Sequence, residues 1–430
     1  MKIESSILNS DSTHYDALET RSAQQRELAL MSALSAQVAH AQAHAAAFGQ
    51  SLADVKAAQV TSRAALARLP VVRKHELLER QHDAGAPDVF GGFSAIGWGA
   101  RPAAQRALRA FASPGPIYEP EGSGADYWRM ARALFAAGFR AGDLVHNSFS
   151  YHFTPAGSMM ESGAFAIGCT VFPAGTGQTE QQVQAMAALK PAGYIGTPSF
   201  LKIILEKAAE SGVALPSLKK ASVGGEAFTP SLRDWFAERG VTAYQSYGTA
   251  DLGLIAYETK AREGLVLDEG VIVEIVRPGT GDPVPIGEVG EVVVTTLNPA
   301  YPLIRFGTGD LSALMPGHCP SGRTNTRIKG WMGRADQTAK VRGMFVHPAQ
   351  VAEIARRHPE VRKARLVVSG EMANDRMVLN VEVEGTPEGL GTRLADTVRE
   401  VTKLRTEVAL CAAGSLPNDG KVIEDARRYT

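Results

Sequence analysis

Six short motifs rich in glycine and charged residues occur in a fixed order along the chain, and their residue types suit a ligand with a flat or anionic part. The motifs are Gly224-Gly225-Glu226, Tyr247-Gly248-Thr249-Ala250-Asp251, Arg305-Phe306-Gly307-Thr308-Gly309-Asp310, Gly333-Arg334-Ala335-Asp336, Lys340-Val341-Arg342-Gly343 and Pro417-Asn418-Asp419-Gly420-Lys421. Each motif is weak evidence by itself, so their ordered series is the stronger signal.

The glycines of the first motif follow a predicted strand. Because Gly224 and Gly225 have no Cβ, the backbone there can approach a ligand closely. We expect these residues, together with Glu226, to contact an adenine or an acyl group. The alternative is a tight turn that requires a positive φ angle.

The second motif combines an aromatic ring with a carboxylate. Tyr247 offers a face for an adenine, and Asp251 offers the hard oxygen that Mg²⁺ prefers. We expect Gly248 and Thr249 to contribute to the same site. Without the other motifs, these residues are equally typical of an ordinary turn.

Three further residues suit the ribose and phosphates of a nucleotide. Asp310 ends a predicted Gly-Thr-Gly-Asp turn, where a carboxylate can accept hydrogen bonds from two ribose hydroxyls, although an Asx-turn is the alternative. Arg334 supplies a planar cation that suits phosphate, although it is equally typical of a surface residue. Lys421 lies in a predicted turn that presents a flexible ammonium group; alone, it is typical of a solvated tail.

A segment with several aromatic rings follows another predicted strand. Phe149, Tyr151, His152 and Phe153 are expected to line a cavity for a flat ring. The alternative is core packing at the end of the strand.

The elements that must position these residues alternate between strand and helix. Residues 15–68 are rich in helix formers, 91–120 have a loop composition, and 126–138 are predicted to be helical. Strands are then predicted at 144–147, 170–172 and 220–223, with helices at 180–189 and 199–211. Such alternation predicts an α/β fold with a mainly parallel sheet.

Beyond Gly253 the pattern becomes rich in strands. Residues 271–276 and 291–295 predict a hairpin or a small barrel, which gives the large domain a β-rich subdomain. A final unit has predicted strands at 364–368 and 378–383 and a helix at 348–357, which indicates a small α+β domain. We therefore predict two domains, at 1–332 and 333–430.

Composition restricts the class of function. The chain has 430 residues, 44% of them hydrophobic, and its 45 basic residues balance its 45 acidic residues. This balance gives no indication of binding to nucleic acid or to an anionic membrane, and no apolar run approaches the roughly 18 residues of a membrane span. We expect a cytoplasmic protein that acts on a small molecule, with its three cysteines reduced.

In its ordered motifs, over about residues 69–430, the sequence resembles the adenylate-forming superfamily, and specifically its phenylacetate-CoA ligase branch. The resemblance implies a small mobile C-terminal domain, a homodimer, and a site for ATP, Mg²⁺ and coenzyme A. It implies that Lys421 is the catalytic lysine and that Arg334 holds ATP. Lys340 is implied to contact the cofactor, and Asp336 to be the hinge.

The sequence departs from this family at the phosphate loop. The loop is expected near residues 112–120, where only Ser113, Gly115 and Pro120 fit the pattern. Prolines have no N–H group, so fewer donors are available for the β- and γ-phosphates. Asp251 replaces the usual glutamate, and Ala250 replaces a phosphate-contacting hydroxyl.

A zinc site found in some relatives is not expected here. His318 and Cys319 remain from its pattern, but Ser321 stands where another cysteine is needed, and a structural zinc needs four ligands.

The sequence therefore favours ATP-dependent activation of an aromatic acid to acyl-AMP, followed by transfer to coenzyme A. Two alternatives stay open. The acyl group is passed to a carrier-protein thiol instead, or the protein binds a nucleotide without catalysis because its phosphate loop is degenerate.

Overall fold

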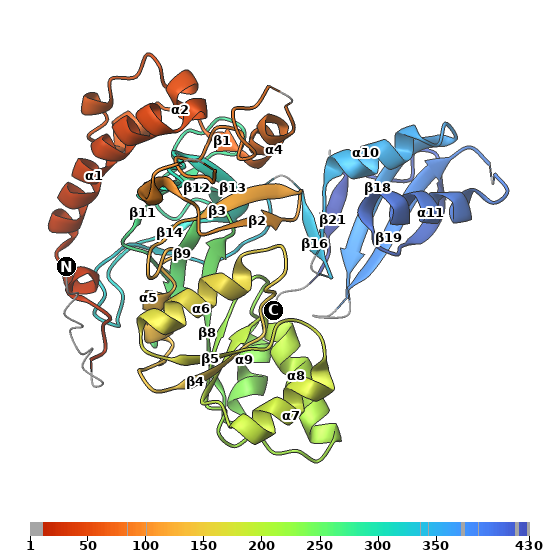
Figure 1. Ribbon diagram of the computed structural model, residues 1–430. Helices are drawn as coiled ribbons and strands as arrows, with labels where there is room; N and C mark the ends of the chain where they lie inside the picture. The colour runs from red at the N-terminus through yellow and green to blue at the C-terminus, as the bar shows by residue number, and fades with distance from the viewer. Residues whose placement is uncertain are drawn as a thin grey trace. The chain divides into compact units, whose positions relative to one another are not determined.

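The structure, a computed structural model, describes residues 12–83, 85–99, 101–335, 337–342, 344–370, 375–385, 387–417 and 421–427. The chain forms two compact units, Met1–Met332 and Gly333–Thr430. Both units combine helices with sheets, which confirms the predicted mixture of α and β structure (Figure 1).

The first unit is built on a large mixed sheet. Its strand order, within the described residues, is β14-β15-β10-β9-β8-β7-β6-β4-β5. The parallel part comprises β4 (Leu144–Asn147), β5 (Thr170–Pro173), β6 (Gly193–Gly196), β7 (Lys220–Val223) and β8 (Thr242–Thr249). An antiparallel extension comprises β9 (Gly253–Glu258), β10 (Leu265–Leu267), β14 (Leu314–Met315) and β15 (Arg327–Ile328). The predicted parallel sheet is confirmed, and its antiparallel extension was missed.

Helices connect the parallel strands as the alternation predicts. They are α6 (Ala156–Ala166), α7 (Thr179–Leu189), α8 (Pro198–Glu210) and α9 (Pro230–Ala237), and α5 (Ala131–Ala136) precedes the first of these strands. The predicted helix at 126–138 is shorter than expected. Its first part is a turn in which Asp126 accepts hydrogen bonds from the backbone N–H groups of Met130 and Ala131, at 2.9 and 3.0 Å.

A second sheet of the first unit has the strand order β1-β13-β12-β11. Its strands are β1 (Val72–Arg73), β11 (Val271–Val276), β12 (Gly290–Thr296) and β13 (Phe306–Ser312). The antiparallel pair β11–β12 confirms the predicted hairpin strands. The predicted Gly-Thr-Gly-Asp turn is wrong, because Asp310 and the residues before it belong to β13, which pairs with β12.

The predicted loop at 91–120 is only partly correct. It contains η3 (Ala103–Gln105) and runs into a hairpin of β2 (Arg109–Ser113) and β3 (Ile117–Glu121). The exposed turn between the strands holds Pro114, Gly115 and Pro116, so the prolines that suggested a loop lie where the ladder needs no donor.

The N-terminal region is helical but interrupted. It contains η1 (Ala17–Thr20), α1 (Ala23–His44), α2 (Ala46–Ser51), η2 (Ala57–Gln59), α3 (Arg63–Leu66) and α4 (Lys74–His82). Helix α1, red in Figure 1, begins with a capping box between Ser22 and Gln25 and buries Leu34 and Val38 in the core. No described helix is long and apolar enough to cross a membrane.

Buried ion pairs connect this N-terminal region to segments far along the chain. Glu19, which is 1% exposed, pairs with Arg323 at 2.8 Å and accepts a hydrogen bond from the Tyr257 hydroxyl. Arg26 pairs with Glu269 at 2.9 Å. A buried ion pair is costly to break because one charge is then left without its partner.

The second unit has a sheet of strand order β20-β19-β18-β21. Its strands are β18 (Val361–Ser369), β19 (Arg376–Val383), β20 (Glu407–Ala412) and β21 (Ile423–Asp425), accompanied by helices α10 (Pro348–Arg356) and α11 (Leu390–Thr402). A separate hairpin consists of β16 (Ala339–Val341) and β17 (Met344–Val346). The predicted strands and helix of this unit are confirmed.

Candidate active site

Asp310 and Tyr247, from different sheets, meet in the first unit. The Tyr247 hydroxyl on β8 lies 2.8 Å from Asp310 Oδ2 and 3.3 Å from Thr308 Oγ1, both on β13. The indole N–H of Trp331 donates to Asp310 Oδ1 at 3.1 Å. Both carboxylate oxygens of Asp310 thus accept hydrogen bonds from neutral donors. Trp331 was not predicted, because an indole donor has no motif of its own.

The glycines of the motifs have structural reasons for their identity. A Cβ on Gly224 would lie 2.9 Å from the Ser246 carbonyl oxygen, and one on Gly248 would lie 2.5 Å from that of Gly253. Gly225 has a φ angle of +79°. The turn alternative therefore accounts for Gly225, close backbone contacts account for Gly224 and Gly248, and contact with a nucleotide stays a prediction.

The remaining polar residues of the first two motifs hydrogen-bond the backbone. Glu226 Oε1 accepts from the Ser199 N–H at 2.6 Å, in the first turn of α8. Thr249 Oγ1 accepts from the Leu252 N–H at 3.2 Å. Both bonds stabilise local structure, and neither prevents contact with a ligand.

Asp251 is the most deeply buried acid among the predicted site residues. Its side chain has no exposed surface and forms an ion pair with Lys74, whose Nζ lies 2.9 Å from Oδ2. Within the described residues, no hydrogen bond satisfies either carboxylate oxygen apart from this ion pair. Lys74, the first residue of α4, was not predicted, because it is far from every motif in sequence.

Glu119, on β3, is a second buried acid in this region. Its carboxyl accepts a hydrogen bond from the Ser113 N–H at 3.2 Å and is bonded to the Ser113 hydroxyl. Burial first, and then the charge of Asp251, raise the pKa of Glu119 to about 8 against the opposing effects of Ser113 and Lys74. A single glutamate between prolines gave no signal in the sequence.

Asp251 fits the Mg²⁺ that the resemblance implies. A buried carboxylate whose oxygens lack hydrogen bonds is a suitable hard donor, and Mg²⁺ commonly uses one or two carboxylates together with substrate phosphates. Among the described residues there is no group of three or more His, Cys, Asp or Glu side chains that could hold a metal by themselves. Cys319 Sγ lies 3.1 Å from Ser321 Oγ and 3.6 Å from Thr259 Oγ1.

Of the four residues of the aromatic segment, two contact other parts of the protein and two are exposed. The Tyr151 hydroxyl accepts from Asn147 at 2.8 Å and donates to Glu161 at 3.0 Å, and Phe149 packs against the core. His152 is exposed, and Phe153 is 82% exposed. The role of these four residues at an acyl pocket stays a prediction.

The predicted cations of the second unit lie at its hairpin and near its C-terminal strand. The Arg334 guanidinium and the Lys340 ammonium lie 5.8 and 5.6 Å from the centre of the Phe345 ring. Lys421 is exposed. Asp336 lies outside the described residues, so its hinge role stays a prediction.

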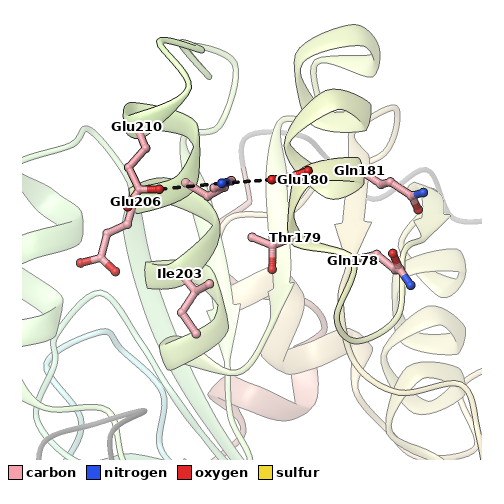
Figure 2. A pocket seen from close by; sticks show the side chains of 8 residues that line it. Gln178, Thr179, Glu180, Gln181, Ile203, Glu206 and Glu210 are labelled. Carbon is pink, nitrogen blue, oxygen red and sulfur yellow. Dashed lines mark ion pairs between the residues drawn. The ribbon is translucent and has the colours of Figure 1, made fainter.

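A surface hollow of about 570 Å³ lies between α7 and α8 (Figure 2). It is lined by Gln178, Thr179, Glu180, Gln181, Ile203, Glu206, Lys207 and Glu210. Lys207 bridges the two helices by an ion pair with Glu180 at 3.1 Å, one of the pairs drawn in Figure 2. None of the predicted site residues lines this hollow, so we do not assign the active site to it.

Known proteins resemble this chain in sequence and in fold. A family model described as AMP-binding enzyme matches residues 125–300. A phenylacetate-coenzyme A ligase from Thermus thermophilus is 36% identical over 59% of this chain and 59% of its own length. The corresponding enzymes of Aromatoleum evansii and Escherichia coli are 33% and 30% identical, over 67% and 78% of their own lengths and 66% and 74% of this chain.

Among solved structures, a 2-hydroxyisobutyryl-CoA ligase superposes with a TM-score of 0.84. The two sequences are 24% identical, and the match covers 100% of this chain and 96% of that one. This likeness confirms the predicted fold class.

Proposed function

Because the chain belongs to the phenylacetate-coenzyme A ligase family of AMP-binding enzymes, we propose that it is an AMP-forming acid:CoA ligase that acts on an aromatic acid. The acid's carboxylate attacks the α-phosphate of ATP, which gives acyl-AMP and pyrophosphate. The thiolate of coenzyme A then attacks the acyl carbon and AMP leaves, which gives the thioester. Membership of the family supports both half-reactions.

The observation that carries this proposal is the hydrogen bond between Tyr247 and Asp310, which joins two motifs 63 residues apart in sequence. In the proposed site, Asp310 accepts hydrogen bonds from the ribose hydroxyls, and the Tyr247 ring offers a face to the adenine. We propose that the surrounding backbone of Gly224, Gly225 and Gly248 admits the nucleotide closely.

Positive charge at the phosphates has several proposed sources. We assign Mg²⁺ to Asp251; when bound, the ion neutralises charge on the phosphate oxygens. The Lys74 ammonium lies beside the same carboxylate and adds positive charge where the hairpin has few donors. Lys421 is proposed to stabilise the charge that builds on the α-phosphate during attack, with Arg334 and Lys340 contributing from the second unit.

The preference for an aromatic acid rests on two things, the aromatic segment and the names of the sequence relatives. A panel of phenylacetate, benzoate, indoleacetate and short aliphatic acids, assayed for pyrophosphate release, tests it. We expect the aromatic acids to give the highest kcat/KM. A clear preference for an aliphatic acid would contradict the substrate assignment and leave the reaction class intact.

The acceptor is tested separately. Thioester formation with free coenzyme A supports the proposal, whereas formation only with a carrier protein would favour the first alternative. ATP binding without pyrophosphate release for any acid would favour a non-catalytic nucleotide-binding protein. We further propose a cytoplasmic homodimer, in keeping with the family, which light scattering and cell fractionation test.

A further inference from the structure

The turn of the β2–β3 hairpin has almost no donor left for an anion. Pro114 and Pro116 have no N–H group. The Ala112 N–H donates to the Phe153 carbonyl at 2.8 Å. The N–H and the hydroxyl of Ser113 both bond to the Glu119 carboxyl. The donors that are best placed for a phosphate are therefore already occupied by a side chain of the same hairpin.

The hairpin is also held in place from outside. Gln81 on α4 pairs with the backbone of Tyr118 twice, as its Nε2 donates to the carbonyl at 2.9 Å and its Oε1 accepts from the N–H at 2.8 Å. Lys74 begins the same helix. Because β3 is fastened to α4, the Ser113–Glu119 bonds are not relieved by a shift of the whole strand.

Glu119 is buried on the side of the hairpin where the other candidate phosphate groups lie. It is 0% exposed, and Ser113 is 6% exposed. The charges of Asp251 and Lys74 act on Glu119 more strongly than any other charged side chain does. The carboxyl is thus in the electrostatic surroundings that the triphosphate of ATP would enter.

We propose that the Glu119 carboxyl is an internal ligand of this hairpin, which occupies the two Ser113 donors and must be displaced before a phosphate can use them. The proposal rests on the proposed function, in which the hairpin faces the phosphates of ATP. Glu119 is then a determinant of nucleotide affinity and not a catalytic residue. Its removal is expected to strengthen ATP binding, which is the opposite of what removal of an ordinary site residue does.

The test uses Glu119→Met, which keeps the side-chain volume and removes both oxygens. Calorimetry is carried out on the full chain with MgATP and, separately, with inorganic tripolyphosphate, in the absence of any acid. We expect both dissociation constants to fall by about tenfold, since freeing two donors is equivalent to about one to two neutral hydrogen bonds. Glu119→Gln retains polar atoms that can bond Ser113 and is expected to stay within about threefold of the wild type.

The matched control is Glu121→Met, which removes a buried glutamate two residues away on the same strand. Glu121 pairs with Arg109 at 3.0 Å and has no bond to Ser113. Its substitution is expected to leave both affinities unchanged. Ser113→Ala in the Glu119→Met background removes one of the freed donors, so most of the gain should disappear.

Thermal melting accompanies every variant, and Glu119→Val replaces Glu119→Met if the latter does not fold. Unchanged or weaker binding of both probes by folded Glu119→Met overturns the proposal, as does a gain that persists in full without the Ser113 hydroxyl. Weaker binding of MgATP alone would make Glu119 a metal ligand, which also overturns it. If the wild type binds no MgATP and releases no pyrophosphate, the proposed function fails, and tripolyphosphate still tests Glu119.

Discussion

Two buried carboxyl groups of the first unit, Asp310 and Glu119, have partners of different kinds. Asp310 is held by the Tyr247 hydroxyl and the Trp331 indole, which are neutral donors from outside the phosphate region. Glu119 is held by Ser113, whose donors belong to the hairpin expected to bind phosphate. Ribose hydroxyls are proposed to bind Asp310 without breaking its existing hydrogen bonds. A phosphate that uses the Ser113 donors must instead displace Glu119. The role of a buried acid thus depends on whether its donors are also needed by the ligand.

In this comparison neither Asp310 nor Glu119 stabilises the charge that builds on the α-phosphate, because that role is proposed for Lys421. Lys421→Ala tests this role and has the largest expected effect. Acyl-AMP formation should fall by about 100- to 1000-fold, the usual cost of losing a group that stabilises transition-state charge. Thioester formation from supplied acyl-AMP should be spared. Rapid-quench assays of the two half-reactions measure this, and equal losses in both would contradict the role given to Lys421.

Asp310→Ala tests the proposed binding of the ribose to Asp310. Because two charge-assisted hydrogen bonds to the ribose disappear, the KM for ATP should rise by about 10- to 100-fold, with about 1.4 kcal/mol for each factor of ten. The same substitution at Glu119 should change ATP affinity in the opposite direction. An unchanged KM in folded Asp310→Ala would place the ribose elsewhere.

Tyr247→Phe and Trp331→Phe test how much the two donors to Asp310 contribute to ATP binding, and their expected effects are smaller. Each removes one neutral donor to Asp310 and leaves its carboxylate in place. The KM for ATP should change by about threefold to tenfold in each variant, since one neutral hydrogen bond contributes about 0.5 to 1.5 kcal/mol. Steady-state kinetics at saturating acid measures this. An effect as large as that of Asp310→Ala would indicate that the donor itself contacts the nucleotide.

The smallest expected effect concerns stability and pH at Glu119. Its pKa is raised from its ordinary value of 4.5 to about 8, so the folded state binds the proton more tightly than the unfolded state. The stability that results is fully present below about pH 4.5 and is lost as the pH rises through about 8. The melting temperature of the wild type should therefore fall by a few degrees relative to Glu119→Gln between pH 6 and 9. Glu79→Gln, at an exposed position of α4, is the control and should show no such trend.

Local pattern was sufficient for much of the fold, because strands β4, β5, β6 and β7 are each followed by a helix. It failed at β13, where Gly307 and Gly309 are typical of a turn and the pairing with strand β12 decides the conformation. It failed again at the β2–β3 hairpin, where the composition of the turn hid the two strands beside it. In both places pairing with a neighbouring strand overrides the local preference of the residues.

The candidate site shows the same limit. Tyr247 and Asp310 were predicted from their motifs and lie together, whereas Lys74, Glu119 and Trp331 were missed. Each missed residue acts through a partner that is distant in sequence or through a strand that was not predicted, so no local spacing identifies it. The positions predicted in the second unit keep their assigned roles as proposals.

The buried ion pairs at the N-terminal region have a consequence for how the chain is made. Glu19 and Arg323 are 304 positions apart, and Arg26 bonds Thr324 across 298 positions. At the usual rate of about 5 to 20 residues per second, the ribosome produces these partners about 15 to 60 s after the N-terminal segment. Throughout that interval α1 can pack against α2 and η2, but Glu19 has no Arg323 and Arg26 has no Thr324 to bond. Nascent chains that end before residue 323 should therefore leave Glu19 without its buried partner, and the N-terminal region should become fully resistant to proteases only after the segment that contains Arg323 and Thr324 has been synthesised.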